Sequence, residues 1–396
     1  MTGWPLVALA DCCHIVSGAT PKTSVATYWD GDIDWVTPKD LSHLDGAYIH
    51  ETPRRITKAG LTSCGATVLP PQSVLFSSRA PIGHVAINTV PMATNQGFKS
   101  LIPHANRVDA KYLFHWLRTN RSYLEGLGNG ATFKEVSKAI VSRIEIPLPP
   151  LDQQRRIAAI LDQADALRAK RREALEHLHD LTQSIFLEMF GEPGSNPHNW
   201  KRARLGDLAS KFSDGPFGSN LKSSHYVEAG VRVVRLQNIG VGEFIDNDQA
   251  YVSESHFASL RKHQCQPGDV LVATLGDPNL RACIQPDWLP IALNKADCVQ
   301  VRVDPDIATP EFVRGLINQP GTLTLAHSLM LGQTRVRISM GRLRELQVPV
   351  PPVERQREFA KIIRSVEHEK TLQLEHQDHL VSAFTSLQWQ AFAGEL

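Results

Sequence analysis

Ile144 to Arg155 reads Ile-Glu-Ile-Pro-Leu-Pro-Pro-Leu-Asp-Gln-Gln-Arg, and Leu346 to Arg357 reads Leu-Gln-Val-Pro-Val-Pro-Pro-Val-Glu-Arg-Gln-Arg. The two stretches are near copies that lie 202 positions apart. Each closes a segment of short apolar runs and opens a long segment without Pro or Gly, which is typical of a helix start. The chain is therefore one design written twice, in the order domain, helix, domain, helix. Such a duplicated chain suits a target that itself has two related halves.

The duplication extends well beyond these two stretches. Trp4–Asp11 aligns with Trp200–Asp207, and Pro71–Phe76 aligns with Pro267–Val272. The offset between the copies grows only from 196 to 202 along the repeated unit, which corresponds to a few loop insertions. Between these anchors the copies barely resemble each other, so we expect two domains of one fold that recognise different things. The predicted segments are 1–150, 151–191, 192–350 and 351–396.

The globular segments consist mostly of short apolar runs broken by Gly, Pro, Asn and Asp. Val74–Phe76, Val231–Val234 and Val270–Val272 are runs of this kind, and their length and composition predict strands. Lys111–Arg118 and Pro310–Ile317 are predicted to form short helices that pack on the sheets. We therefore expect an α+β fold in which each domain has bent, largely antiparallel sheets.

Apolar residues alternate three and four positions apart along both helical segments, which is the heptad pattern of a coiled coil. In the first segment only Arg171 interrupts the stripe. Neither helix can bury its stripe alone, and antiparallel pairing lets each domain sit where the chain leaves one helix and enters the next. We therefore expect an antiparallel coiled coil with pseudo-two-fold symmetry. The predicted seam consists of Ile157, Ile160, Leu167, Leu178, Leu181, Ile185, Phe359, Ile362, Val366, Leu380 and Leu387.

The composition predicts a soluble, cytoplasmic protein. Apolar residues make up 42% of the chain, which is enough to build packed cores. The six cysteines show no Cys-x-x-Cys spacing, so we expect reduced thiols and neither a zinc site nor a disulfide framework. No run approaches the roughly 18 apolar residues of a membrane span. No basic segment followed by an apolar run opens the chain, so we expect no membrane partner.

The net charge is only +1, and it is unevenly distributed. The globular segments carry +3 (1–150) and +1 (192–350), whereas the helical segments carry −1 (151–191) and −2 (351–396). Duplex DNA, with its two antiparallel strands, is the commonest target with two related halves. Because phosphate attraction usually supplies much of DNA affinity, a chain so close to neutral would bind DNA weakly alone. A partner subunit would then share the electrostatic work.

No catalytic constellation is recognisable. The chain has no Gly-x-x-x-x-Gly-Lys-Ser/Thr loop, no Gly-x-Gly-x-x-Gly after a strand and no Asn-Pro-Pro-aromatic motif. Asp30, Asp32 and Asp34 alternate near a turn, but no calcium-loop pattern follows them. We therefore expect a chain that is not an enzyme and binds no metal or cofactor. The alternative is a hidden active site near Cys64 or these aspartates, which turnover by the purified chain would support.

The doubled Pro-Leu-Pro-Pro-Leu-x-x-Gln helix opening resembles the specificity subunit of type I restriction–modification systems. The Trp-x-x-x-x-Leu-x-Asp openings at Trp4 and Trp200 and the Gly-x-Thr segments at Gly130 and Gly332 belong to the same resemblance. It extends from Trp4 to the C-terminus. The second helix opening, Val353–Gln356, departs from the pattern only by conservative changes.

This resemblance implies two target recognition domains, each of which reads one half of a split DNA sequence. It implies that the helices are spacers, which set the gap between half-sites roughly one helical turn apart. The helices would also dock two methyltransferase subunits that bind S-adenosylmethionine and methylate adenine at N6. A separate motor-nuclease subunit would bring ATP and Mg²⁺ for cleavage.

The candidate DNA-binding residues are basic, amide or hydroxyl residues in loops and in the Gly-x-Thr segments, which suit base edges and phosphates. They are Lys22, Lys39, Arg79, Gln96, Lys99, Thr132, Lys134, Asn220, Lys222, Arg235, Asn238, Lys295, Thr334 and Arg335. Two other interpretations stay open. One is a coiled-coil adaptor that contacts only protein, which the low net charge would explain. The other is an orphan DNA-binding module without methyltransferase partners.

Overall fold

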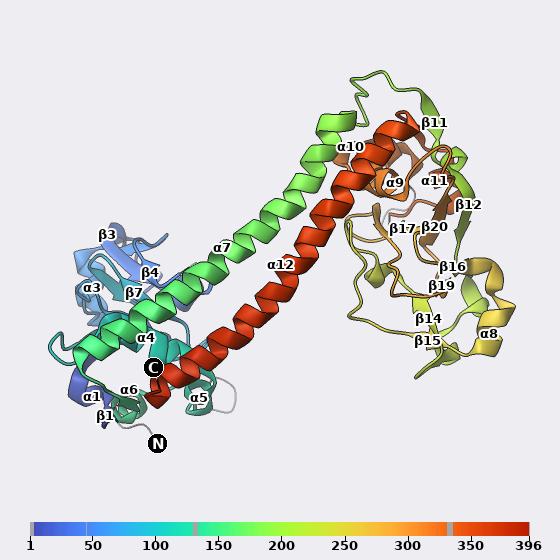
Figure 1. Cartoon of the computed structure of the whole chain (residues 1–396). Coiled ribbons are helices and arrows are strands. Elements are labelled where there is room, and N and C mark those ends of the chain that lie inside the picture. Colours follow the sequence, from blue (N-terminus) through green and yellow to red (C-terminus); the bar gives the residue numbers. More distant parts are fainter. Residues whose placement is uncertain (1–3, 45, 130–133, 331–335, 396) are drawn as a thin grey trace. The chain divides into compact units, whose positions relative to one another are not determined.

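The computed structural model of the chain describes residues 4–44, 46–129, 134–330 and 336–395 (Figure 1). It contains two compact units: Met1–Arg171 with His376–Leu396, here unit 1, and Arg172–Glu375, here unit 2. Each unit combines one globular domain with portions of two long helices, α7 (Leu151–Phe190) and α12 (Val353–Ala393). The combination of helices with sheets confirms the predicted α+β class.

The globular domain of unit 1 is built on a five-stranded sheet in which α4 (Ala110–Thr119) packs on the central strands. In spatial order this sheet contains β2 (Cys13–Ser17), β9 (Lys99–Pro103), β6 (Val74–Phe76), β7 (Val85–Asn88) and β4 (Tyr48–Ile49). A smaller sheet joins β5 (Arg55–Ile56), β3 (Trp29–Val36) and β8 (Met92–Thr94). The shorter helices are α1 (Leu9–Cys12), η1 (Ala26–Tyr28), α2 (Pro38–Ser42), α3 (Lys58–Cys64), α5 (Arg121–Gly126) and α6 (Lys138–Arg143).

The globular domain of unit 2 has a comparable plan, with α9 (Pro310–Ile317) packed on its four-stranded sheet. That sheet contains β12 (Ala209–Asp214), β20 (Cys298–Val303), β17 (Val270–Ala273) and β18 (Arg281–Ile284). A five-stranded sheet contains β13 (Tyr226–Val227), β15 (Tyr251–Val252), β14 (Val231–Val234), β19 (Ala292–Asn294) and β16 (Gln264–Cys265). The shorter helices are η2 (Leu205–Leu208), η3 (Gly218–Asn220), η4 (Ser223–His225), η5 (Leu236–Asn238), α8 (Glu254–Ser259), η6 (Arg261–His263), α10 (Pro320–Ala326), η7 (His327–Leu329) and α11 (Met340–Arg344).

The sheets are largely antiparallel, as predicted. Within the described residues the parallel strand pairs are β3–β8, β4–β7 and β14–β19. The first and last of these are equivalent between the units: Val36 pairs with Thr94 in unit 1, and Val234 pairs with Asn294 in unit 2. The repeated sequence therefore produces a repeated sheet frame.

A short ribbon connects the beginning of each globular domain to the start of the helix that follows it. In unit 1, β1 (Leu6–Ala8) pairs with β10 (Glu145–Pro147). In unit 2, β11 (Arg202–Arg204) pairs with β21 (Gln347–Pro349). The two most similar pieces of the repeat, the domain opening and the proline motif, are thus bonded to each other in both copies.

One glutamine then fixes the first turn of α7 to the globular domain of unit 1. Gln154 is fully buried. Its Nε2 donates to the carbonyl oxygens of Pro149 (2.7 Å) and Arg107 (2.9 Å), and its Oε1 accepts from the backbone N–H of Asp109 (2.8 Å). Asp109 caps the N-terminus of α4, so the glutamine connects the starts of α4 and α7.

The same arrangement occurs at the start of α12 in unit 2. Gln356 is fully buried, and its Nε2 donates to the carbonyl oxygens of Pro351 (2.8 Å) and Ile307 (3.2 Å). Its Oε1 accepts from the backbone N–H of Thr309 (3.0 Å), the N-cap residue of α9. We call this shared set of hydrogen bonds the glutamine latch.

Within each unit, the portions of α7 and α12 pack side by side in opposite directions. In unit 1, Ile157 near the start of α7 shares a hydrophobic core with Phe392 near the end of α12. In unit 2, Phe186 near the end of α7 lies with its ring centroid 5.6 Å from that of Phe359 near the start of α12. Gly191, with a φ of 75°, follows the last residue of α7, which is the usual left-handed end of a helix.

The buried stripe of the helices differs from the predicted heptad seam. Ile157 and Phe359 are buried, but three predicted seam residues are exposed: Leu167 (59%), Leu181 (42%) and Ile362 (42%). The other six are partly buried: Ile160, Leu178, Ile185, Val366, Leu380 and Leu387. Positions outside the predicted seam are buried in their place: Leu161, Ile363 and Phe384. The reason is that each helix packs on its globular domain as well as on the other helix, so its apolar stripe is wider than a two-helix seam.

Among the described residues, no helix is long and apolar enough to cross a lipid bilayer.

We expect Phe359→Ala to lower the free energy of unfolding of unit 2 by about 3–5 kcal/mol, because it leaves a large cavity in the core. The ring is fully buried and lies 5.1 Å, centroid to centroid, from that of Phe190. Urea unfolding of the full chain measures the change. Ile362→Ala, on the exposed face of the same helix, is the control and should cost less than about 0.5 kcal/mol. Equal losses in the two variants would contradict this packing.

A buried histidine makes the contact between α4 and α7 sensitive to pH. His115 Nε2 lies 2.8 Å from Asp162 Oδ1, and the imidazole is fully buried. Burial lowers the pKa of His115, and so does the charge of Arg118. The hydrogen bond and charge of Asp162 and the charge of Asp165 raise it, but the net pKa lies below the ordinary value of 6.5.

We therefore expect unit 1 to lose stability as the pH falls below about 6.5. The unfolded chain binds the proton of His115 more tightly than the folded chain does, so protonation favours unfolding. Thermal unfolding at about pH 7.5 and about pH 5.5, on either side of the ordinary histidine pKa, measures the difference in unfolding midpoint. The difference should shrink in His115→Gln and persist in His14→Gln, which changes an exposed histidine. An unchanged pH dependence in His115→Gln would show that His115 is not responsible.

Candidate nucleic-acid interface

Three loops of unit 1 meet at one edge of its globular domain. The backbone N–H of Ala19 donates to the carbonyl oxygen of Thr94 (2.9 Å), and that of Ser78 donates to the carbonyl oxygen of Gly97 (2.7 Å). The turn after β8 therefore contacts both the loop after β2 and the loop after β6. A Cβ on Gly97 would lie 3.1 Å from Pro38 Cγ, so the start of α2 lies against the same turn.

Three of the candidate residues lie on these segments with exposed side chains. Lys22 follows the loop after β2, Lys39 is the second residue of α2, and Gln96 lies in the turn after β8. The Gln96 carboxamide oxygen accepts a hydrogen bond from the Thr20 hydroxyl. The structure thus brings together residues that are up to 74 positions apart, counted from Lys22 to Gln96.

Arg79 and Lys99 are joined by one carboxylate. Glu135 lies 3.0 Å from Lys99 Nζ and 3.4 Å from Arg79 Nη1. Burial raises the pKa of Glu135, but the hydrogen bonds and charges of Lys99 and Arg79 outweigh burial and hold this pKa below its ordinary value. Lys99 is only 7% exposed and its ammonium group pairs with Glu135 inside the domain, so it is not available to a ligand. Lys134 is exposed beside this group, and Thr132 lies outside the described residues.

The second globular domain uses the same frame at the equivalent edge. The backbone N–H of Lys295 donates to the carbonyl oxygen of Val234 (3.0 Å), as that of Asn95 donates to Val36 (2.9 Å) in unit 1. The backbone N–H of Thr274 donates to the carbonyl oxygen of Asp297 (3.0 Å), in the place of the Ser78–Gly97 bond. The side chains on this edge differ between the units, although the backbone bonds are shared.

In unit 2 two candidate residues flank an aromatic ring that the sequence did not single out. The Arg235 guanidinium lies 5.8 Å and Lys295 Nζ lies 5.6 Å from the ring centroid of Tyr226. Both distances suit a cation–π interaction. Arg235 also forms an ion pair with Asp248. Tyr226 opens a two-residue strand, and no spacing or motif in the sequence relates it to Arg235 or Lys295.

The other candidates of unit 2 divide into exposed and buried residues. Asn220, the last residue of η3, and Lys222, which directly precedes η4, are exposed. Asn238 is fully buried, and its carboxamide bonds only inside the domain, to backbone atoms of Arg235 (2.9 Å) and Asp248 (2.9 Å) among others. Asn238 therefore shapes the loop and cannot reach a base edge. Thr334 and Arg335 lie outside the described residues.

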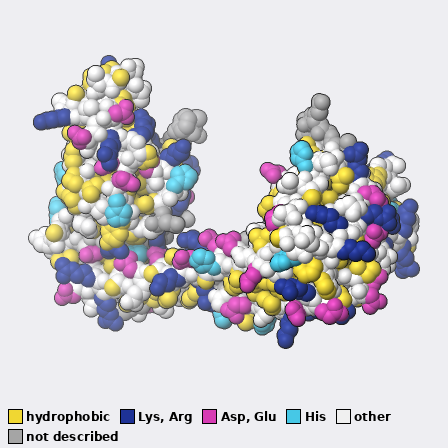
Figure 2. All heavy atoms as spheres, turned by 90° about the horizontal axis from the view of Figure 1, so that it is seen from above, with side chains coloured by type: hydrophobic (Ala, Val, Ile, Leu, Met, Phe, Trp, Pro, Cys, Tyr) yellow, Lys and Arg dark blue, Asp and Glu magenta, His cyan; other side chains and the backbone are white. Residues whose placement is uncertain are grey.

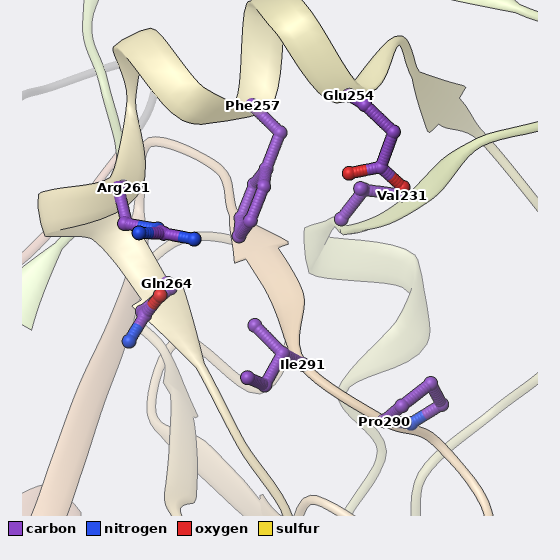
Figure 3. A pocket seen from close by; sticks show the side chains of 7 residues that line it. All are labelled: Val231, Glu254, Phe257, Arg261, Gln264, Pro290 and Ile291. Carbon is purple, nitrogen blue, oxygen red and sulfur yellow. The ribbon is translucent and has the colours of Figure 1, made fainter.

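Unit 2 also has a pocket of about 440 Å³ beside α8. Figure 3 shows the Phe257 ring projecting into it opposite Ile291, with Arg261 and Glu254 on either side of the ring. Its remaining lining residues are Val231, Gln264 and Pro290. No candidate DNA-binding residue lines this pocket, so the pocket is separate from the loop edge that carries Arg235 and Lys295.

Charge on the surface is mixed. On the face shown in Figure 2, Lys and Arg side chains are interspersed with Asp and Glu on both units. This distribution agrees with the net charge of +1. A strong phosphate attraction by either unit alone therefore has no support from this face.

The residues of the alternative enzymatic interpretation have structural contacts. Asp34 Oδ1 accepts from the backbone N–H of Thr52 (3.1 Å) and pairs with Arg55 Nε (3.2 Å). Cys64 Sγ donates to the carbonyl oxygen of Gly60 in its own helix (3.4 Å). Within the described ranges, no group of three or more His, Cys, Asp or Glu side chains could hold a metal ion. The Thr52 hydroxyl also donates to Asp34 Oδ1 (3.1 Å), and it donates to the carbonyl oxygen of Arg54 (2.7 Å), so Asp34 and Thr52 hold the local backbone in place.

Known proteins with similar sequences include specificity subunits of type I restriction enzymes. Residues 1–177 match the family described as the type I restriction modification DNA specificity domain. The type I restriction enzyme MjaIX specificity subunit of Methanocaldococcus jannaschii is 32% identical over 263 residues. That match covers 62% of this chain and 60% of the relative, so it spans less than two thirds of the relative's length.

Solved structures share the fold over the full length of the chain. A chain from a structure concerning complex assembly and conformational transition of the type I R-M system superposes with a TM-score of 0.64. It is 20% identical, and the match covers 100% of this chain and 98% of that one. The type I restriction-modification system S subunit from M. genitalium gives a TM-score of 0.55 at 15% identity, with coverage of 99% and 96%. At these identities the likeness concerns the fold alone.

We expect Lys99→Met to destabilise unit 1 by about 1–3 kcal/mol, because it removes a charged partner from Glu135 in a half-buried site. Urea unfolding measures the change. Lys22→Met removes the same charge from an exposed position and should change stability by less than about 0.5 kcal/mol. If Lys99→Met is as stable as the unaltered chain, Lys99 has no structural role and returns to the candidate DNA-binding residues.

Proposed function

We propose that this chain, which belongs to the specificity subunits of type I restriction–modification systems, reads a split DNA sequence with its two globular domains. Residues 1–150 and 192–350 are the two target recognition domains, and each reads one half-site. The observation that carries this proposal is the repeated sheet frame with unlike side chains on its equivalent loop edges. One backbone plan with two sets of polar side chains suits two different half-sites on one duplex.

The residues proposed to contact DNA are the candidates whose side chains are exposed or partly exposed on these edges; Arg79, Arg235 and Lys295 are the partly exposed ones. Exposed Lys, Asn and Gln side chains can bond base edges in the major groove or phosphates. We add Tyr226, because its ring lies within cation–π distance of Arg235 and Lys295 and would hold their charged groups in place. In the first domain the set is Lys22, Lys39, Arg79, Gln96 and Lys134. In the second it is Asn220, Lys222, Arg235 and Lys295.

The long helices are proposed to act as spacers. Residues 151–191 and 351–396 would form an antiparallel coiled coil with pseudo-two-fold symmetry, and its length would set the gap between half-sites. Opposite running directions in each unit support this arrangement. The exposed apolar side chains of Leu167, Leu181 and Ile362 suit the docking of two methyltransferase subunits.

The chemistry of modification and cleavage would belong to partner subunits. The chain itself is proposed to be non-catalytic and to bind no cofactor. Methyltransferase subunits would supply S-adenosylmethionine, and motor-nuclease subunits would supply ATP and Mg²⁺. The net charge of +1 supports this division, because a partner must then supply much of the phosphate attraction. The same low charge favours a protein-only adaptor as the second candidate.

We expect that deleting the gene abolishes N6-adenine methylation at one split motif in the source cell, as mapped across the genome. A complementing chain with Lys22, Lys39 and Gln96 changed to alanine should methylate sites that vary in one half of that motif, because it no longer requires a particular base at those positions. Each base contact is worth roughly 1–3 kcal/mol. The other half-site and the gap should stay the same, because the second domain and the helices are unaltered.

Lys58→Ala serves as the control, because Lys58 is exposed on α3 outside the loop edge. Methylation that is unchanged after deletion contradicts the proposed function and favours the second candidate, an adaptor that contacts only protein. A triple variant that methylates the unaltered motif shows that the first domain reads DNA with other residues.

A further inference from the structure

The glutamine latch cannot tell the two halves of the chain apart. Gln154 and Gln356 make the same three kinds of hydrogen bond, and all their partners are backbone atoms. Two of the three partners of each glutamine belong to the globular domain, so either domain offers them to either long helix. We call the contact surface between a globular domain and the start of a long helix its seat. Connectivity along one chain favours the native seat, so a second contact matters most when domains could be exchanged between copies.

An ion pair of one polarity lies beside the first latch. Lys111, two residues after the N-cap Asp109 of α4, places its Nζ 2.6 Å from Asp162 Oδ2. Asp162 lies eight residues after Gln154 on α7. The base is therefore on the globular domain and the acid is on the long helix. Both side chains are largely shielded, with exposures of 23% and 37%.

The ion pair at the equivalent place in unit 2 has the opposite polarity. Glu311, two residues after the N-cap Thr309 of α9, lies 2.8 Å from Arg364 Nη1. Arg364 lies eight residues after Gln356 on α12. Here the acid is on the globular domain and the base is on the long helix. Glu311 is the more buried partner, with 10% of its side chain exposed, whereas the Arg364 side chain is 63% exposed.

The neighbouring ion pairs do not distinguish the seats. Arg118 pairs with Asp165 in unit 1, and Arg314 pairs with Glu367 in unit 2. The two acids lie eleven residues after the latch glutamine, but Arg118 lies nine residues after its N-cap and Arg314 only five. In both cases the globular domain supplies the base and the long helix supplies the acid. These two pairs therefore share a sign but not a position on the globular domain, and a further pair, Lys370 with Glu243, occurs in unit 2. Lys111–Asp162 and Glu311–Arg364 lie at equivalent positions on both elements and are opposite in sign.

We propose that the reversed ion pair is a recognition contact that seats each globular domain on its own long helix and excludes the other helix, in the same chain or in a second copy. In an exchanged seat, Lys111 would face Arg364 and Glu311 would face Asp162. Like charges at such short distance disfavour that seat, most strongly where the buried carboxylate of Glu311 would face Asp162. In the correct seats both contacts are attractive. This inference rests on the geometry of the two seats and does not depend on DNA reading.

The test makes the two seats alike and then makes them different again. Glu311→Lys/Arg364→Asp gives both halves the polarity of the first half while keeping an ion pair in each correct seat. Adding Lys111→Glu/Asp162→Arg reverses the first half as well, so the seats differ once more. Because Asp162 also bonds the buried His115, this chain carries His115→Gln in addition; we call it the fourfold variant after its four charge reversals. The full-length chains are refolded from urea over a range of protein concentrations. Size-exclusion chromatography with light scattering measures the fraction of monomer and of defined dimer.

We expect the unaltered chain and the fourfold variant to refold to monomer, and the double variant to give domain-exchanged dimers. The dimer fraction of the double variant should exceed that of the unaltered chain at least about fivefold and should rise with concentration, as expected when sequence no longer selects the partner. Arg121→Glu/Glu125→Arg reverses an exposed ion pair within α5 and should behave as the unaltered chain.

Two results overturn the proposal. One is a double variant that refolds to monomer as completely as the unaltered chain. The other is a fourfold variant that dimerises or fails to fold as much as the double variant, because the damage would then be local and not a loss of choice. Failure of DNA reading leaves both measurements intact, since neither uses DNA.

Discussion

The glutamine latch is the contact on which the rest of the structure depends. It fixes the first turn of each long helix to a globular domain through a fully buried side chain whose bonds are all satisfied by the backbone. A buried carboxamide left without these partners would be costly, so the geometry of the junction is strongly determined. The ribbon between the domain opening and the proline motif holds the same junction from the other side. The orientation of each loop edge relative to its own helix follows from these two contacts.

Beyond the junction, the two halves keep a common frame and differ where they face outward. The parallel pairs β3–β8 and β14–β19 and the backbone bonds of the loop edges are equivalent. On those edges, unit 1 has Lys22 and Gln96, whereas unit 2 has Lys295 beside Tyr226. The pattern of shared backbone and divergent side chains supports the proposal that the two domains read different half-sites.

Local sequence signals predicted the elements, and tertiary contacts decided the rest. Strands such as Val231–Val234 and the helix Pro310–Ile317 were predictable because apolar runs and an N-terminal proline act locally. The seam was less predictable because packing on the globular domain, not heptad spacing alone, determines which side chains are buried. The burial of Lys99 and Asn238 depends on partners distant in sequence or on loop closure, which composition does not reveal.

The latch also explains how such a chain tolerates change. Its partners on the globular domain are a carbonyl oxygen and an amide N–H, which every residue except proline supplies in full. Side chains elsewhere in the domain can therefore diverge without loosening the junction. A recombination event that replaced the entire first globular domain would preserve the geometry of the junction, provided that the incoming segment kept the same main-chain path at the positions of Arg107 and Asp109.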